Sequence, residues 1–380
     1  MVKGLYIHIP FCHQICHYCD FNKVFFENQP VDRYIEMLGR ELDLWKASGA
    51  LNSPMETVFF GGGTPTALDP GQLERLLGHV RRNVVLAEGC EWTSEANPDE
   101  LNRAKLDVLF AGGVNRLSMG VQSFDEDLLG RLGRTHGNGD VDRAITEARE
   151  AGFTNISLDL MYGLPGQTMD QWEKTLDRAF SYELPHFSAY SLIVEPKTVF
   201  YNLLMKGKLR TPGEDLEAEM YRVLMERMAA HGLHQYEISN FAKPGRKSRH
   251  NLLYWNNEEY IGAGAGSHGY VDGVRYSNHG PLKKYMAPLE EWKRPVLQEQ
   301  AVSPAEQMEE EMFLGLRKNE GVSETLFREK FNVSLDAVYG EKLEKLLAIG
   351  NLERSDGFVR LTDSGRFVGN DVFSEFLLGD

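Results

Sequence analysis

Residues 5–21 read LYIHIPFCHQICHYCDF, and this stretch holds Cys12, Cys16 and Cys19, three of the four cysteines in the chain. The apolar run before the first cysteine is typical of a buried β-strand, which places the CxxxCxxC pattern on the loop that follows it. Clustered cysteines in a reducing compartment more often bind metal or carry out redox chemistry than form disulfides, so these three are candidate metal ligands. Cys90 stands alone and is interpreted as a small buried hydrophobic residue.

Three thiolates on one tight loop can hold three corners of a [4Fe-4S] cluster and leave the fourth iron without a protein ligand. The amino and carboxylate groups of S-adenosylmethionine (SAM) can chelate that iron, and an electron from the reduced cluster can cleave the sulfonium bond to give a 5'-deoxyadenosyl radical. The alternative is a zinc site completed by His13, His17 or Cys90. A c-type haem attachment motif is excluded, because Asp20 and not His follows Cys19.

Short apolar segments alternate with amphipathic stretches through the first two thirds of the chain. Residues 31–45, VDRYIEMLGRELDLW, show helical periodicity, with Tyr34, Leu38 and Leu42 on one face. Parallel strands need long connections, so a series of strand-helix units predicts an α/β fold, an open or partial (β/α) barrel. Reacting groups in barrels collect on the loops at the carboxyl ends of the strands. The predicted strands begin at Leu5, Glu56, Glu91, Asn115, Asn155 and His186.

The chain is predicted to have three parts. Residues 1–235 form the core barrel. Residues 236–303 form an extension with a polar, partly basic loop at 242–251 and a Gly-rich run further on. Residues 304–380 form a small C-terminal α+β domain, because the pattern changes there to short helices and a hairpin-like ending, NLERSDGFVRLT.

Composition and charge narrow the classes of function. The chain has 380 residues, of which 42% are hydrophobic and 26% charged, as is typical of a folded globular protein. The formal net charge of -15 repels a phosphate backbone, so nucleic acid is not an expected partner. The start of the sequence lacks the pattern of a signal peptide, and no apolar run approaches membrane-spanning length, so we expect a cytoplasmic protein.

A glycine-rich loop and several polar residues follow the later strands. GGGTPT, residues 61–66, comes directly after the second predicted strand, and its backbone amides would suit the charged methionine end of SAM. Each feature taken alone would fit an ordinary turn, a surface salt bridge or a strand-end cap. Because the carboxyl ends of parallel strands share one edge, we expect these groups to meet the cysteine loop. The polar residues are Glu95, Gln122, Arg134 and Asp159.

The order of CHQICHYCDF, GGGTPT, SEANPDE, NRLSMGVQSF, LGRTH, DLMYGLPGQT, AYSLIVEP, YEISNFAKPG and HNLLYW resembles the HemN/HemW branch of radical SAM proteins over nearly the whole chain. The resemblance implies a radical SAM barrel with a [4Fe-4S] cluster on Cys12, Cys16 and Cys19. Glu95 can accept a hydrogen bond from the ammonium of SAM, Arg134 can pair with its carboxylate, and Asp159 or Gln122 can bind ribose hydroxyls. The SAM contacts implied are Tyr6, Tyr18, Gly62, Gly63, Thr64, Glu95, Gln122, Arg134 and Asp159.

Two activities compete within this branch. Oxygen-independent coproporphyrinogen III dehydrogenases oxidatively decarboxylate propionate side chains, whereas HemW-type haem chaperones bind haem and pass it to recipient haemoproteins. The dehydrogenase pattern extends the cysteine motif to CxxxCxxCxC and has an N-terminal extension, but here Asp20 and Phe21 follow Cys19 and the first strand begins at about Leu5. HNLLYW, residues 250–255, resembles the HNxxYW motif of the chaperones. These features favour a haem chaperone with haem as cargo, recipients that include membrane-associated haemoproteins, and an electron donor if SAM is cleaved.

The same resemblance makes HNLLYW the candidate haem site. His250 can serve as an axial iron ligand, and the alternative is a hydrogen-bonded structural histidine. Tyr254 and Trp255 could cover a porphyrin face. A third possibility, an RNA-modifying radical SAM enzyme, conflicts with the acidic net charge. The cations that could neutralise haem propionates are Lys243, Arg246, Lys247 and Arg249.

Overall fold

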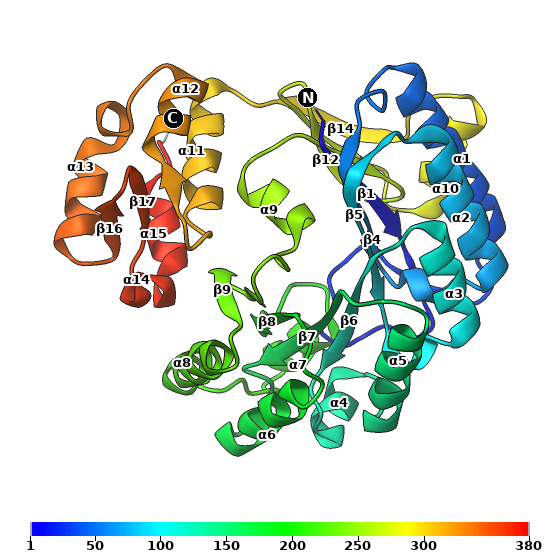
Figure 1. Ribbon diagram of the computed structural model, residues 1–380, viewed down its shortest axis with the longest axis horizontal. Coiled ribbons are helices and arrows are strands. Elements are labelled where there is room, and N and C mark those ends of the chain that lie inside the picture. The colour runs from blue at the N-terminus through cyan, green and yellow to red at the C-terminus, as the bar shows by residue number, and fades with distance from the viewer. Residues whose placement is uncertain (1, 379–380) are drawn as a thin grey trace.

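The computed structural model describes residues 2–378, and its centre is a curved sheet of twelve strands (Figure 1). Seven neighbouring strands run parallel in the order β11-β1-β4-β5-β6-β7-β8. The edge strands β14 (Val296–Ala301) and β9 (His234–Glu237) do not pair with each other, so the barrel stays open and the predicted partial (β/α) barrel is confirmed. The parallel strands are β1 (Gly4–Ile9), β4 (Met55–Gly62), β5 (Leu86–Ala96), β6 (Arg116–Gln122), β7 (Ile156–Tyr162), β8 (His186–Ser191) and β11 (Tyr260–Ala263).

Helices connect the successive strands and cover the outer face of the sheet (Figure 1). Local sequence sets where they begin: Asp69 and Gln72 form a capping box at the start of one helix, and Thr168 and Gln171 do the same at another. The third helix, RAKLDVLFAG, was not predicted, because its apolar pattern is weak. The helices are α1 (Val31–Ala47), α2 (Pro70–Asn83), α3 (Arg103–Gly112), α4 (Glu126–Leu132), α5 (Asn138–Glu150), α6 (Met169–Phe180), α7 (Val199–Met205) and α8 (Glu214–Ala230).

Side chains alternate between the two faces of each strand, and the two faces differ in polarity. On β6, Leu117, Met119 and Val121 are fully buried in the main hydrophobic core. Arg116 and Ser118 occupy the alternate positions and point to the inside of the barrel. The parallel strands therefore present a polar inner face, which is where a polar ligand can bind.

The strands after α8 extend both edges of the sheet, and α9 (Arg249–Trp255) lies on its concave side (Figure 1). The loop predicted over 242–251 was wrong from Arg249 onward, because Ser248 caps a helix by accepting a hydrogen bond from the amide of Asn251 at 3.4 Å. The added elements are β9 (His234–Glu237), β10 (Asn240–Ala242), β12 (His268–Val271), β13 (Val274–Asn278), β14 (Val296–Ala301) and α10 (Leu282–Glu290).

The C-terminal part of the chain forms a small α+β unit with a hydrophobic core of its own, as predicted. Met312, Phe327, Leu343 and Val359 are among the buried residues of this core. The expected terminal hairpin is present as two antiparallel strands. Its elements are α11 (Pro304–Gly315), β15 (Val322–Ser323), α12 (Glu324–Phe331), α13 (Leu335–Ala348), β16 (Leu352–Ser355), β17 (Phe358–Leu361), α14 (Asp363–Phe367) and α15 (Gly369–Glu375).

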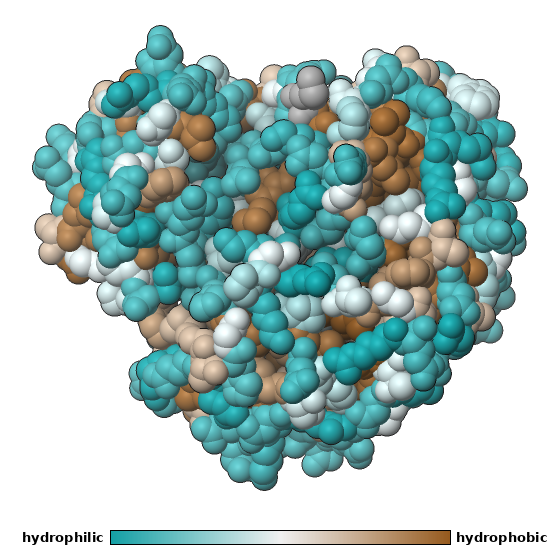
Figure 2. Space-filling view, viewed as in Figure 1, coloured by the Kyte–Doolittle hydropathy of each residue, from teal (hydrophilic) through white to brown (hydrophobic). Residues whose placement is uncertain are grey.

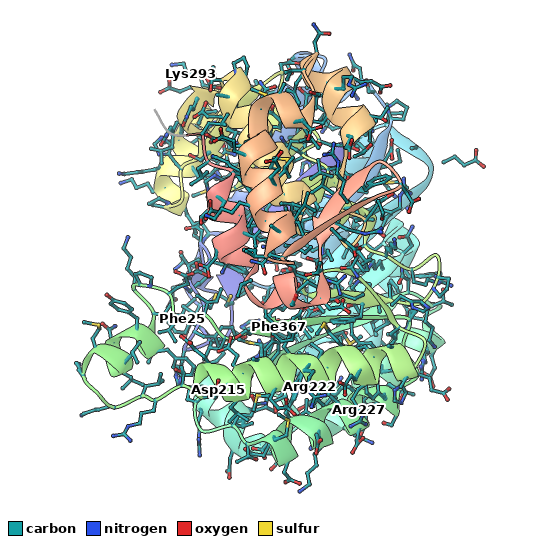
Figure 3. All side chains as sticks on the ribbon, turned by 90° about the vertical axis from the view of Figure 1, so that its left-hand side faces the viewer. Phe25, Asp215, Arg222, Arg227, Lys293 and Phe367 are labelled. Carbon is teal, nitrogen blue, oxygen red and sulfur yellow. The ribbon has the colours of Figure 1, made fainter. Side chains whose placement is uncertain are left out.

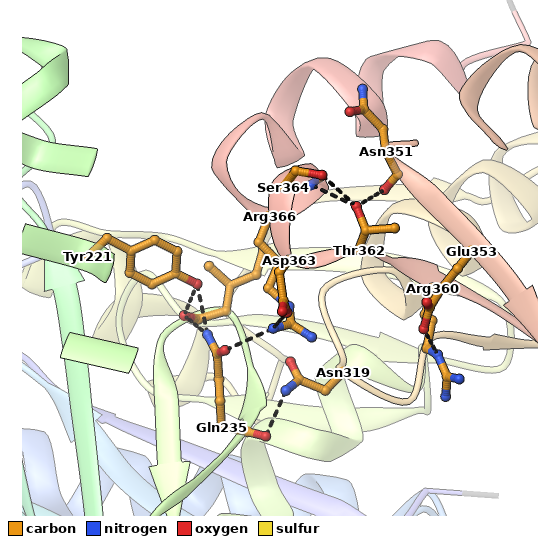
Figure 4. Close-up of polar contacts among 12 residues, drawn as sticks. Tyr221, Gln235, Asn319, Asn351, Glu353, Arg360, Thr362, Asp363, Ser364 and Arg366 are labelled. Atoms are coloured by element: carbon orange, nitrogen blue, oxygen red, sulfur yellow. Dashed lines mark hydrogen bonds and ion pairs between the residues drawn. The ribbon is translucent and has the colours of Figure 1, made fainter. Parts of the chain in front are cut away.

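The C-terminal unit packs against α8 and β9 through aromatic and polar contacts. Phe367 faces α8 (Figure 3), and its ring lies 5.4 Å from that of Tyr221 in an edge-on arrangement. Gln235 links the two parts (Figure 4): its amide nitrogen donates to the Tyr221 hydroxyl at 2.7 Å, and its backbone carbonyl accepts from Asn319 at 2.8 Å. These contacts fix the C-terminal unit beside the open edge of the barrel.

Hydrophilic residues cover most of the face shown in Figure 2, in keeping with the net charge of -15. Within residues 2–378, none of the helices combines the length and the apolar composition that crossing a bilayer requires.

Candidate functional site

A cavity of about 310 Å³ lies at the edge of the sheet where the parallel strands end. The predicted cluster and SAM residues meet there, with the exception of Tyr6, as expected for groups at the carboxyl ends of parallel strands. Tyr6 instead bonds through its hydroxyl to Nδ1 of His8 at 3.0 Å and stacks on Phe59. The predicted residues that line the cavity are Cys12, Cys16, Tyr18, Cys19, Gly62, Gly63, Thr64, Glu95, Gln122, Arg134 and Asp159.

The cysteine loop is held between two short parallel strands, β2 (Phe11–Cys12) and β3 (Val24–Phe25). The amide of His17 donates to the carbonyl of Leu132 at 2.9 Å, which ties the middle of the loop to the end of α4. Two thiols receive hydrogen bonds: Thr64 Oγ1 lies 3.7 Å from Cys12 Sγ, and Arg134 Nη1 lies 3.5 Å from Cys16 Sγ. Such donors favour the thiolate form that metal binding needs.

Burial opposes that form and raises the pKa of the Cys12 thiol to about 12. It also raises the pKa of Cys19. A cationic partner is therefore needed for these sulfurs to carry negative charge. Bound iron supplies such a charge. Within residues 2–378 no three ligands converge on a single metal ion, so the three thiols suit a multi-iron cluster and not one ion.

The glycine loop holds the cysteine loop in place, and its amides are already used within the protein. Gly62 donates to Glu95 Oε2 at 3.2 Å, Gly63 to the Ile9 carbonyl at 2.8 Å, and Thr64 to the Phe11 carbonyl at 2.8 Å. The expectation that these amides would be free for the methionine end of SAM was therefore wrong. The glycines instead let the two loops pack closely against each other, since a Cβ on Gly63 would lie 2.7–2.9 Å from backbone atoms before Cys12.

Two carboxylates on neighbouring inner positions give the cavity its acidic side. Burial, followed by the nearby charge of Asp159, raises the pKa of Glu95 to about 8. Burial also raises the pKa of Asp159, whose Oδ1 accepts a hydrogen bond from Ser118 Oγ at 3.1 Å. Neither carboxylate forms an ion pair within the described chain, 2–378. A ligand with a positive charge would satisfy both groups.

Arg134 gives the same cavity a positively charged group. Its Nη1 donates to Asn97 Oδ1 at 3.0 Å, its Nη2 donates to the carbonyl of Gly120, and its Nε lacks a partner. It follows Gly133, which adopts a left-handed conformation at φ 74° and ends α4. The cavity thus offers a guanidinium and two carboxylates, which fits a zwitterionic, sulfonium-bearing molecule such as SAM.

The residues that could complete a zinc site have other partners. His13 donates to the carbonyl of Ala67 at 3.3 Å, and His17 to that of Arg131 at 2.8 Å. Cys90 is buried in the main core and lies outside the cavity, as interpreted from the sequence. The three thiols and the open cavity beside them therefore fit a [4Fe-4S] cluster with SAM better than a mononuclear zinc ion.

The HNLLYW motif lies away from the cysteines, on α9. His250 is 1% exposed, and its Nδ1 and Nε2 are bonded to Thr57 Oγ1 and the Tyr254 hydroxyl, both at 2.8 Å. Burial lowers the pKa of His250 to about 3, so the ring is neutral. Trp255 faces the guanidinium of Arg317 at 4.5 Å. In this arrangement His250 has the geometry of a structural histidine, and iron could reach Nε2 only after its bond to Tyr254 had broken.

The basic residues that precede the motif also lie apart from the three clustered cysteines. Arg246, Lys247 and Arg249 line a separate cavity of about 530 Å³ with Cys90 and Glu91. Arg249 is committed in part to the protein, because it donates to the carbonyl of Gly89 at 2.8 Å. The predicted haem residues therefore do not meet in one cavity, because Tyr254 and Trp255 line a different one and Lys243 donates to the carbonyl of Glu183 at 3.4 Å.

Comparison with known proteins identifies the family. Residues 6–179 match the radical SAM superfamily, and residues 302–368 match the HemN C-terminal domain. The chain is 50% identical over 377 residues to the heme chaperone HemW of Bacillus subtilis (strain 168), with 99% of each chain covered. The chain belongs to the HemW family. It is also 44% identical to the heme chaperone HemW of Lactococcus lactis, with 100% of this chain and 98% of that protein covered.

The fold of this HemW-family chain is also that of a solved radical SAM enzyme. Coproporphyrinogen III oxidase (HemN) from Escherichia coli superimposes with a TM-score of 0.86 at 23% identity, covering 99% of this chain and 90% of that one. The family implies a [4Fe-4S] cluster and SAM, which the cavity residues fit.

The cavity also contains residues that were not predicted, among them Asn97, Ser118 and Tyr190. Asn97 bonds both Arg134 and, at 3.3 Å, Thr64 Oγ1. A signal was present for both Asn97 and Ser118. Asn97 follows Glu95 by two positions, just past the end of β5, and Ser118 lies directly opposite Glu95 on the adjacent strand β6. Tyr190 gave no such signal in the sequence.

Proposed function

We propose that this protein binds haem and transfers it to recipient haemoproteins, with a [4Fe-4S] cluster on Cys12, Cys16 and Cys19 and SAM in the adjoining cavity. The observation that carries the proposal is 50% identity to a haem chaperone over 99% of both chains. Phe21 adds support, because it lines the cavity at the position where the dehydrogenase pattern has a further cysteine.

Each charged residue of the cavity would bind a group of SAM that complements it. Arg134 would pair with the carboxylate of SAM, while Glu95 and Asp159 would bind its cationic and hydroxyl groups. Gln122 and Thr64 would complete the polar wall, and the three thiolates would hold the cluster. When bound, the reduced cluster and SAM supply one-electron chemistry at the sulfonium. The cysteine loop, which is fixed by its backbone hydrogen bonds, would hold the cluster beside SAM.

We place haem beside α9, where Tyr254 and Trp255 line a cavity of about 350 Å³. Tyr260, Tyr270 and Phe313 add aromatic surface to the same cavity, as suits a flat apolar ring. His250 stays a candidate axial ligand, with the condition that its Nε2 leaves the Tyr254 hydroxyl.

We also propose the division into 1–235, 236–303 and 304–380, and a cytoplasmic location. The separate hydrophobic core after Pro304 supports the last boundary. The strands between 236 and 303 belong to the main sheet, so the middle part is best understood as an extension of the barrel.

The test uses cluster-loaded protein under anaerobic conditions, first titrated with haem and then mixed with a haem-free acceptor protein. Coproporphyrinogen III, SAM and a reductant are supplied in a parallel reaction. We expect a Soret band, transfer to the acceptor and no decarboxylation. Decarboxylation of coproporphyrinogen III with proportional SAM consumption would overturn the proposal in favour of the dehydrogenase.

The role of His250 is tested separately with His250→Ala and Tyr254→Phe. If imidazole binds the iron, His250→Ala should weaken haem binding or shift the Soret band, while Tyr254→Phe should preserve or tighten binding because it frees Nε2. The matched control is His186→Ala, since His186 is also buried and bonded at both nitrogens, to Ser157 and Tyr236. Equal spectra for the His250 variant and wild type would exclude ligation by His250.

A further inference from the structure

Arg116, the first residue of β6, is an arginine enclosed in the barrel, with 2% of its surface exposed. One terminal nitrogen lies 3.3 Å from Nδ1 of His186, and its Nε has no hydrogen-bond partner. Burial lowers the pKa of His186 well below its usual value, so this neighbour is neutral. In the described part of the chain, Arg116 makes no ion pair. A buried guanidinium is costly unless negative charge nearby compensates it.

The strand register places two carboxylates on the same inner face as Arg116. They lie nearer than Arg116 to the carboxyl ends of the strands, where the cavity is. Ser118, two residues after Arg116, pairs with Glu95 of β5 and with Ser157 of β7. Ser118 also bonds Asp159, so it points to the inside of the barrel. Side chains two apart on a strand share a face, and Arg116 therefore lies directly behind the pair of carboxylates.

The charge of Arg116 acts on both carboxylates. It lowers the pKa of Glu95 and of Asp159, and so works against the burial that raises them. Asp159 raises the pKa of Glu95 and of Tyr190, and Glu95 raises the pKa of Tyr6 and of Tyr254, because negative charges repel one another. The other groups that face this pair are Tyr6 of β1, the Gly62 amide of β4, Tyr190 of β8, Tyr254 of α9, and Arg134.

We propose that Arg116 is a positioning residue that favours the negatively charged forms of Glu95 and Asp159, so that the cavity holds the cationic ammonium and sulfonium groups of SAM more tightly. Arg116 sits behind the carboxylates and away from the ligand, which lets it compensate their charge without occupying the cavity. This inference rests on the proposed SAM site. Without Arg116, the pair would hold a proton more tightly, so that binding a cation would require a higher pH.

The test measures the dissociation constant of SAM on cluster-loaded full-length protein by anaerobic equilibrium dialysis between pH 6.5 and pH 9. The variants are Arg116→Met, which removes the charge, and Arg116→Lys, which keeps it. Arg149→Met is the control, because Arg149 donates to the carbonyl of Tyr182 on the outside of the barrel. Each constant is divided by the wild-type value at the same pH, which cancels the titration of SAM and of the cluster.

If one carboxylate pKa rises by a unit, Arg116→Met should bind SAM about tenfold more weakly at pH 6.5, and the ratio should fall toward one by pH 9. Arg116→Lys should stay within about twofold of wild type, and the control should give a flat ratio near one. Iron content and thermal unfolding are recorded for each protein.

A ratio for Arg116→Met that is unchanged by pH, or equal to one throughout, would overturn the inference, because lost packing has no reason to titrate. If Arg116→Met fails to load a cluster, Arg116→Lys decides: a wild-type pH profile supports the role of the charge, and a shifted profile refutes it. Wild-type protein that binds no SAM would defeat the proposed function itself, which separates the two failures.

Discussion

Gly63→Ala should loosen the cysteine loop from strand β4. A Cβ at this position would lie 2.7 Å from the carbonyl carbon of Pro10 and 2.9 Å from the carbonyl oxygens of Ile9 and Phe11. Since ordinary contact begins at 3.4 Å, the backbone just before Cys12 would have to move by about 0.7 Å. That movement would stretch the 2.8 Å hydrogen bond from the Gly63 amide to Ile9.

The size of the effect follows from those contacts. Overpacking against fixed atoms costs about 1–3 kcal/mol, and a weakened backbone hydrogen bond adds about 0.5–1.5 kcal/mol. We expect the free energy of unfolding in urea to fall by roughly 2–4 kcal/mol. Iron and sulfide retained after gel filtration should fall as well, because the displaced segment leads directly into Cys12.

Gly130→Ala is the matched control, since a Cβ there has no heavy atom within 4 Å and lies in helix α4. It should leave iron content unchanged and stabilise the helix slightly. Wild-type stability and wild-type iron content in Gly63→Ala would refute the view that β4 clamps the cysteine loop.

Three further predictions concern the cluster, SAM binding and pH. Reconstituted protein should carry about four irons per chain; Cys16→Ser should abolish this cluster and Cys90→Ser should not, so iron loss in the second variant would show that Cys90 is misplaced. Asp159→Asn should weaken SAM binding by about 1–3 kcal/mol at unchanged iron content, and calorimetry showing wild-type affinity would remove Asp159 from the site. Burial raises the pKa of Glu41 to about 7 from an ordinary value of 4.5, so the folded protein keeps a proton that the unfolded chain releases. Between these pH values stability should fall as pH rises, by up to about 3 kcal/mol, and parallel urea profiles for wild type and Glu41→Gln would contradict this.

Much of the barrel could be predicted because its signals are local. Each strand start from Leu5 to His186 matched the structure to within a few residues, apart from the longer β5, since apolar runs followed by amphipathic helices define such units by themselves. Cys12, Cys16 and Cys19 were assigned to one loop from their spacing. Glu95 and Asp159 were assigned to one edge because parallel strands carry their ends to the same side.

Other features depended on contacts between distant segments. The sequence suggested free amides at Gly63 and Thr64, but the carbonyls of Ile9 and Phe11 accept both of them. The sequence around His250 is the same whether its ring binds iron or Thr57. Only the packing of α9 against β4 decided which partner it meets in this structure.

The amino-acid sequence by itself determined the order of the strands and helices, the cysteine loop and the family, because these follow from periodicity and motif spacing along one segment. Only the tertiary structure decided how charge is balanced inside the barrel. Arg116 on β6, Glu95 on β5 and Asp159 on β7 come together through strand register, and a register is set by the hydrogen bonds between strands that are far apart in the chain.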